Sequence, residues 1–306
     1  MGKIAFVFSG QGAQAPGMGR SLYEHSPAAR AVLDAADAIR PGTVRQCFEG
    51  SEEELKETKN TQPCLFAVEL AAAAALKKAG LTADMTAGFS LGELSALCYG
   101  GAADFETLFR LTCLRGERMQ KAAEGRPTAM AAVVKLSAEA VEKLCAEFRQ
   151  VYAVNYNCPG QISVSGAAEE LDAFAAAVKA AGGRAIPLKV RGAFHSPFMA
   201  EAALEFGKAV DTSSLRDPRI PVYADCTGEP YGPGAVKALL KAQMCAPVRW
   251  ETAVRNMIGA GADVFVELGP GKTLCGLISK TDPSVRCFPA SSMEDVEILM
   301  REVEPC

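Results

Sequence analysis

One serine lies between two glycines at a spacing that could make its hydroxyl a nucleophile. Ser90 is the centre of Gly88-Phe89-Ser90-Leu91-Gly92, a Gly-x-Ser-x-Gly sequence. A tight strand-to-helix turn needs small residues on both sides of the serine, because side chains there would clash. Such a turn projects the hydroxyl at the end of a sheet and places the next amide, that of Leu91, where it can donate to an oxyanion. Taken alone, the pattern fits an ordinary turn serine equally well.

A serine hydroxyl needs a base, and the chain has only two histidines, His25 and His195. His195 follows a predicted strand and precedes a predicted helix, at a domain junction where clefts tend to form. His25 leads into Ser26-Pro27, where a surface or capping role is the better interpretation. We therefore predict that His195 is the base; the alternative is a histidine that satisfies backbone groups in a turn.

Arg115 is a candidate for binding an anionic substrate. It lies in Leu111–Gly116, within a predicted helix whose N-terminal half is apolar. A buried arginine that faces a cleft presents a planar fork suited to a carboxylate, a geometry that lysine cannot reproduce. The alternative is an arginine on a solvated helix face or in a surface ion pair.

Two glycine patterns resemble nucleotide sites but lack required features. Gly10-x-Gly12-x-x-Ala15 follows a strand, but Pro16-Gly17-x-Gly19 delays the helix that a dinucleotide fingerprint needs. Gly271-Lys272-Thr273 resembles the end of a phosphate loop, but Val266 occupies the position of that motif's first glycine. Nucleotide hydrolysis is therefore not the predicted function.

Composition excludes further classes of protein. The chain carries 32 Lys and Arg against 36 Asp and Glu, a net charge of −4, which excludes a binder that neutralises nucleic-acid phosphates. The 11 cysteines are never closer than 12 positions, so their spacing predicts no redox pair and no metal site. The longest apolar run, Cys64–Leu76, is interrupted by Glu69 and too short to span a bilayer. We expect a soluble cytoplasmic protein in a reduced compartment.

The elements that must position these residues alternate between strands and helices. The patterns predict a buried strand over Lys3–Phe8, a helix from Ser26-Pro27 to Ile39, a helix from near Thr61 to Gly80, and a weak strand over Met85–Ala87. The same patterns predict a helix over 93–99, a strand over 264–268 and a helix over 273–280. This alternation is typical of an α/β domain.

Between these elements the pattern becomes shorter and more regular. It predicts strands over 129–136, 151–155, 162–165 and 185–190, with helices over 137–148 and 168–181. The order β-α-β-β-α-β is the ferredoxin-like arrangement. We therefore predict an inserted small domain over residues 127–190 and a large α/β domain formed by residues 1–126 and 191–306.

Together these residues resemble the malonyl-CoA:acyl carrier protein transacylase family. The matching segments, in the family's order, are Phe8–Gln14, Gly88–Leu97, Leu114–Gly116 with Met119-Gln120, Asn155–Gln161, Ala193–Pro197, Gln243 with Pro247-Val248 and Trp250, and Glu267–Gly271. The resemblance implies an α/β-hydrolase-like large domain with a ferredoxin-like insertion, which agrees with the element order read from the patterns.

The resemblance also implies catalytic roles. Ser90 would be the nucleophile and His195 the base, and the amides of Gln11 and Leu91 would form the oxyanion hole. Gln243 stands where the family uses a main-chain carbonyl, instead of an acid, to orient the histidine.

Substrate-binding roles follow in the same way. Arg115 would pair with the free carboxylate of malonyl, Asn157 and Gln161 would be lesser pocket residues, and Phe194 would favour malonyl over methylmalonyl. The chain departs from the family at Phe89, where a histidine usually precedes the nucleophile, so a polar contact beside the serine is lost.

The implied reaction is a ping-pong transfer of malonyl from malonyl-CoA to phosphopantetheinylated acyl carrier protein, without a cofactor, for fatty acid synthesis. We expect a monomer with a basic patch for the acidic carrier protein, and Lys189 and Arg191 are candidates for it. Trans-acting loading of polyketide carrier proteins has the same chemistry. Two different functions also fit the residues: a serine esterase or thioesterase and, because of Phe89, a non-catalytic carrier-binding scaffold.

Overall fold

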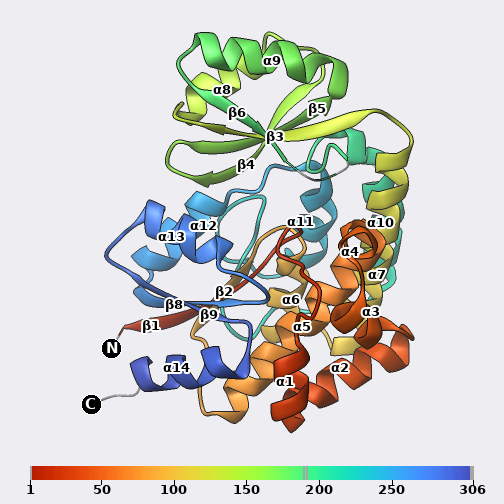
Figure 1. Cartoon of the computed structure of the whole chain (residues 1–306), viewed down its shortest axis with the longest axis vertical. Coiled ribbons are helices and arrows are strands. Elements are labelled where there is room, and N and C mark those ends of the chain that lie inside the picture. The colour runs from red at the N-terminus through yellow and green to blue at the C-terminus, as the bar shows by residue number, and fades with distance from the viewer. Residues whose placement is uncertain (1, 189, 191, 304–306) are drawn as a thin grey trace.

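The molecule contains two separate β-sheets, which lie one above the other along its long axis (Figure 1). The computed structural model describes residues 2–188, 190 and 192–303. The larger sheet has five strands in the order β7-β2-β1-β8-β9, and all of its pairings are parallel. Its strands are β1 (Lys3–Phe8), β2 (Met85–Gly88), β7 (Val222–Tyr223), β8 (Ala262–Leu268) and β9 (Arg286–Ala290).

The register of the parallel strands places their carboxyl ends together. Phe8, the last residue of β1, is opposite Gly88 of β2 and Leu268 of β8. Loops that leave parallel strands at this edge converge, and ligand sites of open α/β sheets form there. The loop after β1 and the serine turn after β2 are therefore neighbours although they are about 80 positions apart.

Helices cover both faces of this sheet, so its central strands β2, β1 and β8 are buried on both sides. Phe6 and Phe8 face a large core, whereas Ala5 and Val7 face a smaller one formed with α12 and α13. The helices of the large unit are α1 (Arg20–His25), α2 (Pro27–Ile39), α3 (Thr43–Glu49), α4 (Glu52–Lys56), α5 (Thr58–Lys78), α6 (Gly92–Tyr99), α7 (Phe105–Glu124), α10 (Ala200–Thr212), α11 (Val236–Ala242), α12 (Trp250–Gly259), α13 (Thr273–Thr281) and α14 (Met293–Val303), with short 3-10 turns η1 (Pro197–Met199) and η2 (Gln243–Cys245).

Most of the predicted elements are present, but several boundaries differ: the helix predicted over 137–148 ends at Cys145, and α5 begins almost a full turn earlier than predicted. Helix α2 begins as predicted, because the hydroxyl of Ser26 accepts a hydrogen bond from the amide of Ala29 and Pro27 is its first residue. Helix α5 was expected from near Thr61 but begins at Thr58. Its first turn is stabilised by tertiary contacts, such as the bond from Thr61 Oγ1 to the Leu55 carbonyl at 2.5 Å, which sequence patterns do not reveal.

The smaller sheet has the predicted ferredoxin-like order. Its four antiparallel strands run in the order β4-β5-β3-β6, and α8 and α9 lie on its outer face (Figure 1). This sheet and its two helices form the small unit, whose elements are β3 (Thr128–Val134), α8 (Ala138–Cys145), β4 (Val151–Cys158), β5 (Gln161–Ala167), α9 (Ala168–Ala180) and β6 (Arg184–Pro187). All of them fall inside the predicted insertion, whose boundaries at 127 and 190 stay a prediction.

Strand β6 is shorter than predicted. It was expected over 185–190 and ends at Pro187, opposite Ala131 of β3. Proline has no N–H to continue the ladder, although the next amide, that of Leu188, still donates to the Met130 carbonyl. Lys189 and Arg191, the predicted basic patch, lie outside the described residues.

The two units are joined by backbone hydrogen bonds close to the predicted catalytic histidine. The amide of Val248 donates to the Val154 carbonyl at 2.8 Å, and the amide of Tyr156 donates back to the Val248 carbonyl at 2.9 Å. The hydroxyl of Ser165 on β5 donates to the Phe194 carbonyl at 3.1 Å. The small sheet thus holds both the loop before His195 and the segment after η2.

No helix among the described residues is long and apolar enough to cross a membrane.

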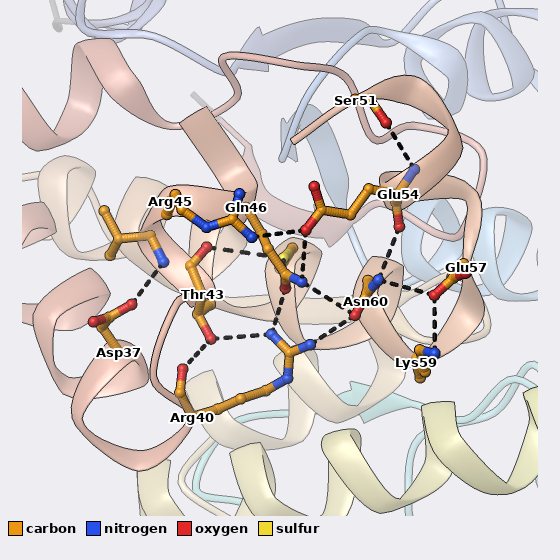
Figure 2. A network of polar contacts seen from close by, with 12 residues as sticks. Asp37, Arg40, Thr43, Arg45, Gln46, Ser51, Glu54, Glu57, Lys59 and Asn60 are labelled. Carbon is orange, nitrogen blue, oxygen red and sulfur yellow. Dashed lines mark hydrogen bonds and ion pairs between the residues drawn. The ribbon is translucent and has the colours of Figure 1, made fainter. Parts of the chain in front are cut away.

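A polar network locks the first turn of α5 to three preceding elements (Figure 2). Asn60 is its centre and is only 5% exposed. Its Oδ1 accepts hydrogen bonds from Arg40 at 2.7 Å and from Gln46 at 3.3 Å. Its Nδ2 donates to the Glu54 carbonyl at 3.0 Å and to Glu57 Oε2 at 3.3 Å. These bonds tie the end of α2, α3 and α4 to the start of α5.

Replacement of Asn60 by alanine should destabilise the fold. The substitution leaves the partly buried Nη2 of Arg40 without its acceptor, and an unsatisfied group of this kind costs about 1–3 kcal/mol. Urea unfolding should show that loss in the free energy of unfolding. The control is Arg45→Ala, which removes an ion pair to Glu54 from a side chain that is 56% exposed and should cost at most about 1 kcal/mol. Equal midpoints for Asn60→Ala and wild type would contradict the network's importance.

Candidate active site

Ser90 occupies a tight turn between β2 and α6. Its backbone has a φ of 55°, in the left-handed region that non-glycine residues rarely adopt. A Cβ on Gly88 would lie 1.9 Å from the carbonyl carbon of Gly92, and a Cβ on Gly92 would lie 2.3 Å from the Phe8 carbonyl oxygen. Both glycines are therefore required by close backbone contact, and the turn holds the serine in a strained conformation of the kind found at functional sites.

The structure brings Ser90 and His195 together. Ser90 Oγ lies 2.6 Å from His195 Nε2. His195 Nδ1 faces two main-chain carbonyls, at 3.0 Å from Gln243 O and 3.2 Å from Ala246 O. Carbonyl oxygens only accept hydrogen bonds, so Nδ1 carries the proton and Nε2 is free to accept the proton of the serine hydroxyl. His25, by contrast, is exposed at the end of α1.

Burial keeps His195 neutral. The side chain is 3% exposed, and desolvation, followed by the charge of Arg115, lowers its pKa to about 4. The two carbonyl acceptors oppose this shift because they stabilise the protonated ring. A neutral imidazole at physiological pH is what a general base requires.

Arg115 lies beside the serine and is fully buried on α7. Its Nη2 donates to Ser90 Oγ at 3.2 Å and to Gln243 Oε1 at 2.7 Å. Its Nε and Nη1 are also buried, and neither has a hydrogen-bond partner within the part of the chain that the structure describes. Burial lowers the pKa of Arg115 to about 10, so the guanidinium stays charged at neutral pH. The guanidinium of Arg115 is therefore a buried cation beside the Ser90 hydroxyl, and its Nε and Nη1 have no partner among the described residues.

The side chain of Gln243 connects this cation to buried acids. Its Oε1 accepts from Arg115, while its Nε2 donates to Asp225 Oδ2 at 3.0 Å and to the carbonyl of Ser90 at 2.5 Å. Glu93 Oε1 accepts from the amide of Asp225 at 2.9 Å and from Tyr231 Oη at 2.6 Å. Burial raises the pKa of Glu93 to about 7, and burial together with the Glu93 charge raises that of Asp225 well above its usual range.

Sequence reasoning missed several members of this group: Glu93, Asp225, Tyr231 and Ala246. A signal existed for Glu93, since an acid in the apolar helix after the serine turn has to be buried with partners. The other three carried none, because their contacts come from distant segments. For Gln243 the family resemblance implied the role of the main-chain carbonyl but gave none to the side chain.

The loop after β1 packs against the serine turn. A Cβ on Gly10 would lie 2.7 Å from the Phe89 carbonyl oxygen, so the amides of Gln11 and Leu91 belong to two segments in close contact. Neither amide donates a hydrogen bond to any residue that the structure describes. Gln11 is further held by its Nε2, which donates to Thr58 Oγ1 at 3.2 Å. Their role as oxyanion donors stays a prediction.

A cavity of about 430 Å³ opens next to this loop. One wall comes from the loop 11–16 after β1, a second from α4, and a third from Leu188 and Val190 at the end of the small unit. The cavity therefore lies between the two units and reaches Gln11.

The remaining predicted site residues are Asn157, Gln161 and Phe194. Asn157 donates to Ser163 Oγ at 3.1 Å, and Gln161 accepts from Lys280 Nζ at 3.4 Å. Neither is hydrogen-bonded to Ser90 or His195 among the described residues, and their place in the pocket stays a prediction. Phe194 is buried directly before His195.

Phe89, the departure from the family pattern, packs against the smaller core and the loop after β1, where its Cδ1 would lie 2.8 Å from a Cβ on Gly10. Its ring packs edge-on against Trp250, with centroids 5.5 Å apart. It belongs with the partly buried residues of the smaller core beneath β1. No group of three or more His, Cys, Asp or Glu side chains that could hold a metal occurs in the described part of the chain.

Comparisons with known proteins agree with this geometry. The family model described as "Acyl transferase domain" matches residues 5–301. The chain belongs to the acyl transferase family. It is 38% identical to a "Malonyl CoA-acyl carrier protein transacylase" of Bacillus subtilis, with 99% of this chain and 98% of that protein covered.

Solved structures of similar acyl transferases cover almost all of the chain. The crystal structure of the malonyl CoA-acyl carrier protein transacylase from Clostridium perfringens has a TM-score of 0.95 at 31% identity, over 98% of this chain and 97% of that one. A malonyl-transacylase in complex with a type II PKS acyl-carrier protein has a TM-score of 0.94 at 30% identity, over 98% and 99%.

The depressed pKa of His195 predicts an unusual pH dependence. If the neutral imidazole is the base, kcat/KM for acyl transfer should fall on the acid side with a midpoint near 4, well below the ordinary histidine value of 6.5. Initial rates between pH 3 and 8, with folding followed by circular dichroism at each pH, measure this midpoint. An acid limb at 6.5 or higher in a folded chain would contradict the assignment.

Proposed function

We propose that this acyl transferase moves the malonyl group from malonyl-CoA to the phosphopantetheine thiol of acyl carrier protein through a malonyl ester on Ser90. The observation that carries the proposal is the buried Arg115 fork, 3.2 Å from the nucleophilic oxygen, with two donors that have no partner in the described structure. Such a fork suits the free carboxylate of a malonyl group attached to the serine. The names of the similar proteins support the same substrates.

In the first half-reaction His195 Nε2 takes the proton of Ser90 as Oγ attacks the thioester carbonyl. The amides of Gln11 and Leu91 donate to the oxyanion of the tetrahedral intermediate, where the loss of one such donor costs about 3 kcal/mol. The carbon–sulfur bond then breaks, coenzyme A leaves with the proton from His195, and a malonyl ester remains on Ser90.

The second half-reaction runs the same steps in reverse. The phosphopantetheine thiol gives its proton to His195 and attacks the ester carbonyl, and Ser90 Oγ leaves with that proton. Main-chain carbonyls orient the imidazole in both halves, since Nδ1 faces Gln243 O and Ala246 O. No cofactor is needed to balance either step.

Arg115 gives the site its acyl preference in this proposal. Its charge favours a carboxylated acyl group over acetyl, and it fixes the ester in a pose that water attacks poorly. Phe194, buried beside His195, would narrow the pocket against methylmalonyl, and Asn157 and Gln161 would line it.

Acyl carrier protein is the proposed macromolecular partner, and a similar transacylase has been solved with such a carrier. We propose that the chain works as a cytoplasmic monomer in fatty acid synthesis. Because the carrier in that complex belongs to a type II PKS, loading of a polyketide carrier protein is the second candidate. The chemistry at Ser90 is the same for both carriers.

Arg115→Ala should reduce malonyl transfer more than acetyl transfer. Hydrogen bonds to charged groups contribute about 1.5–3 kcal/mol, so kcat/KM for malonyl-CoA should fall about 10- to 100-fold. The malonyl-to-acetyl ratio should fall in parallel, measured with holo acyl carrier protein as acceptor. Arg110→Ala, an exposed ion-paired arginine on the same helix, is the control and should leave the ratio unchanged. An unchanged ratio in Arg115→Ala would remove the assignment.

The same assay separates transfer from hydrolysis. Malonyl-CoA consumption should depend on carrier protein, and free malonate should form slowly in its absence. Rapid hydrolysis of malonyl-CoA at the same rate with and without carrier protein would favour a thioesterase over an acyl transferase.

A further inference from the structure

Glu69 is a buried acid that the proposed mechanism does not use. It lies in the middle of α5 and has no exposed surface. Its Oε1 accepts a hydrogen bond from Ser9 Oγ at 2.8 Å, and its Oε2 accepts one from Ser95 Oγ at 2.6 Å. None of the ion pairs among the described residues includes it. A carboxyl in this position needs an explanation, since desolvation of an acid is costly.

The two serines belong to the segments that carry the proposed oxyanion donors. Ser9 follows the last residue of β1 and is two positions before Gln11. Ser95 lies on α6, one turn after Leu91. One carboxyl on α5 therefore links the loop that carries the Gln11 amide to the helix that follows the Leu91 amide.

The surroundings of this link leave little room for movement. Gly269 has a φ of 114°, and a Cβ there would lie 2.2 Å from Ser9 Oγ and 3.1 Å from Glu69 Cγ. The amide of Ser9 donates to the Leu268 carbonyl at 3.2 Å, which fixes the start of the loop on β8. The bridge is enclosed by β1, α6 and the turn after β8.

We propose that Glu69 is a positioning residue for acyl transfer, which sets the spacing of the two oxyanion amides by binding Ser9 and Ser95 at once. The inference rests on the proposed function, because it concerns the same oxyanion. It gives α5 a role in the rate of the chemical step in addition to its role in the core. A displacement of about 1 Å in such a site can cost about 100-fold in rate.

The charge state of Glu69 predicts which substitution should be tolerated. Burial raises its pKa well above the usual range, the two serine hydrogen bonds oppose this, and the charge of Glu267 raises it further. Burial therefore disfavours the carboxylate, and a neutral side chain of the same shape should fit between the two serines. Glutamine has that shape, and because a serine hydroxyl can either donate or accept, its amide can bond Ser9 at one end and Ser95 at the other.

The test compares Glu69→Leu with Glu69→Gln in single-turnover acylation of Ser90 by saturating malonyl-CoA. We expect Glu69→Leu to slow acylation about 10- to 100-fold, and Glu69→Gln to retain most of the wild-type rate. The dissociation constant of malonyl-CoA, measured in a Ser90→Ala background, should stay the same in all three chains, because the bridge acts on the transition state. If Glu69→Leu does not fold, Ser9→Ala and Ser95→Ala replace it in the test, since each removes one of the two hydrogen bonds to Glu69.

Thr281→Val is the matched control, since it deletes a buried hydroxyl whose hydrogen bond stays within α13. It should acylate at the wild-type rate. Wild-type acylation rates in Glu69→Leu or in both serine variants would overturn the inference, as would a slowing explained entirely by weaker binding of malonyl-CoA. A folded wild-type chain that forms no malonyl ester would contradict the proposed function itself.

Discussion

A guanidinium without access to water has to be kept charged by its neighbours, and this constraint organises the catalytic centre. Arg115 is fully buried, and desolvation alone would favour its neutral form. Asp225 and Glu93 oppose that effect when they are ionised, and Gln243 connects the fork to Asp225 through its amide. Buried charges are expensive unless they are paired or hydrogen-bonded, so these residues form one unit with the proposed substrate-binding arginine.

Gln243 couples this unit to the nucleophile and its base. Its carbonyl holds His195 in the tautomer that can accept a proton, while its side chain contacts both Arg115 and the main chain of Ser90. The orientation of the amide is unambiguous, because Arg115 only donates and the Ser90 carbonyl only accepts. The base, the nucleophile and the proposed carboxylate site thus keep a fixed relation, and no acid among the described residues is hydrogen-bonded to the imidazole.

Local sequence patterns predicted the architecture well because its elements are strongly periodic. The serine turn followed from Gly88 and Gly92, and the ferredoxin-like order followed from short strands and helices in regular alternation. The start of α5 was predicted too late, since contacts such as Thr61 to Leu55 stabilise its first turn. Element boundaries of this kind depend on tertiary structure.

The candidate site could be predicted only in part. Ser90, His195 and Arg115 have residue types and spacings that indicate chemistry, and the structure places the serine within hydrogen-bond distance of the other two. The buried acids that support them are recognisable only from contacts such as the one between Glu93 and the amide of Asp225, which are 132 positions apart. Glu69 was interpreted only as an interruption of an apolar run, whereas the fold makes it a bridge between two serines.

The most direct test of covalent catalysis by Ser90 is the mass of the intact chain after incubation with malonyl-CoA, followed by mapping of the modified peptide. We expect one malonyl group, located on Ser90, which a carrier-protein thiol removes and which Ser90→Ala does not acquire. A folded wild-type chain that gains no malonyl group, or gains it on another residue, would contradict the role assigned to Ser90.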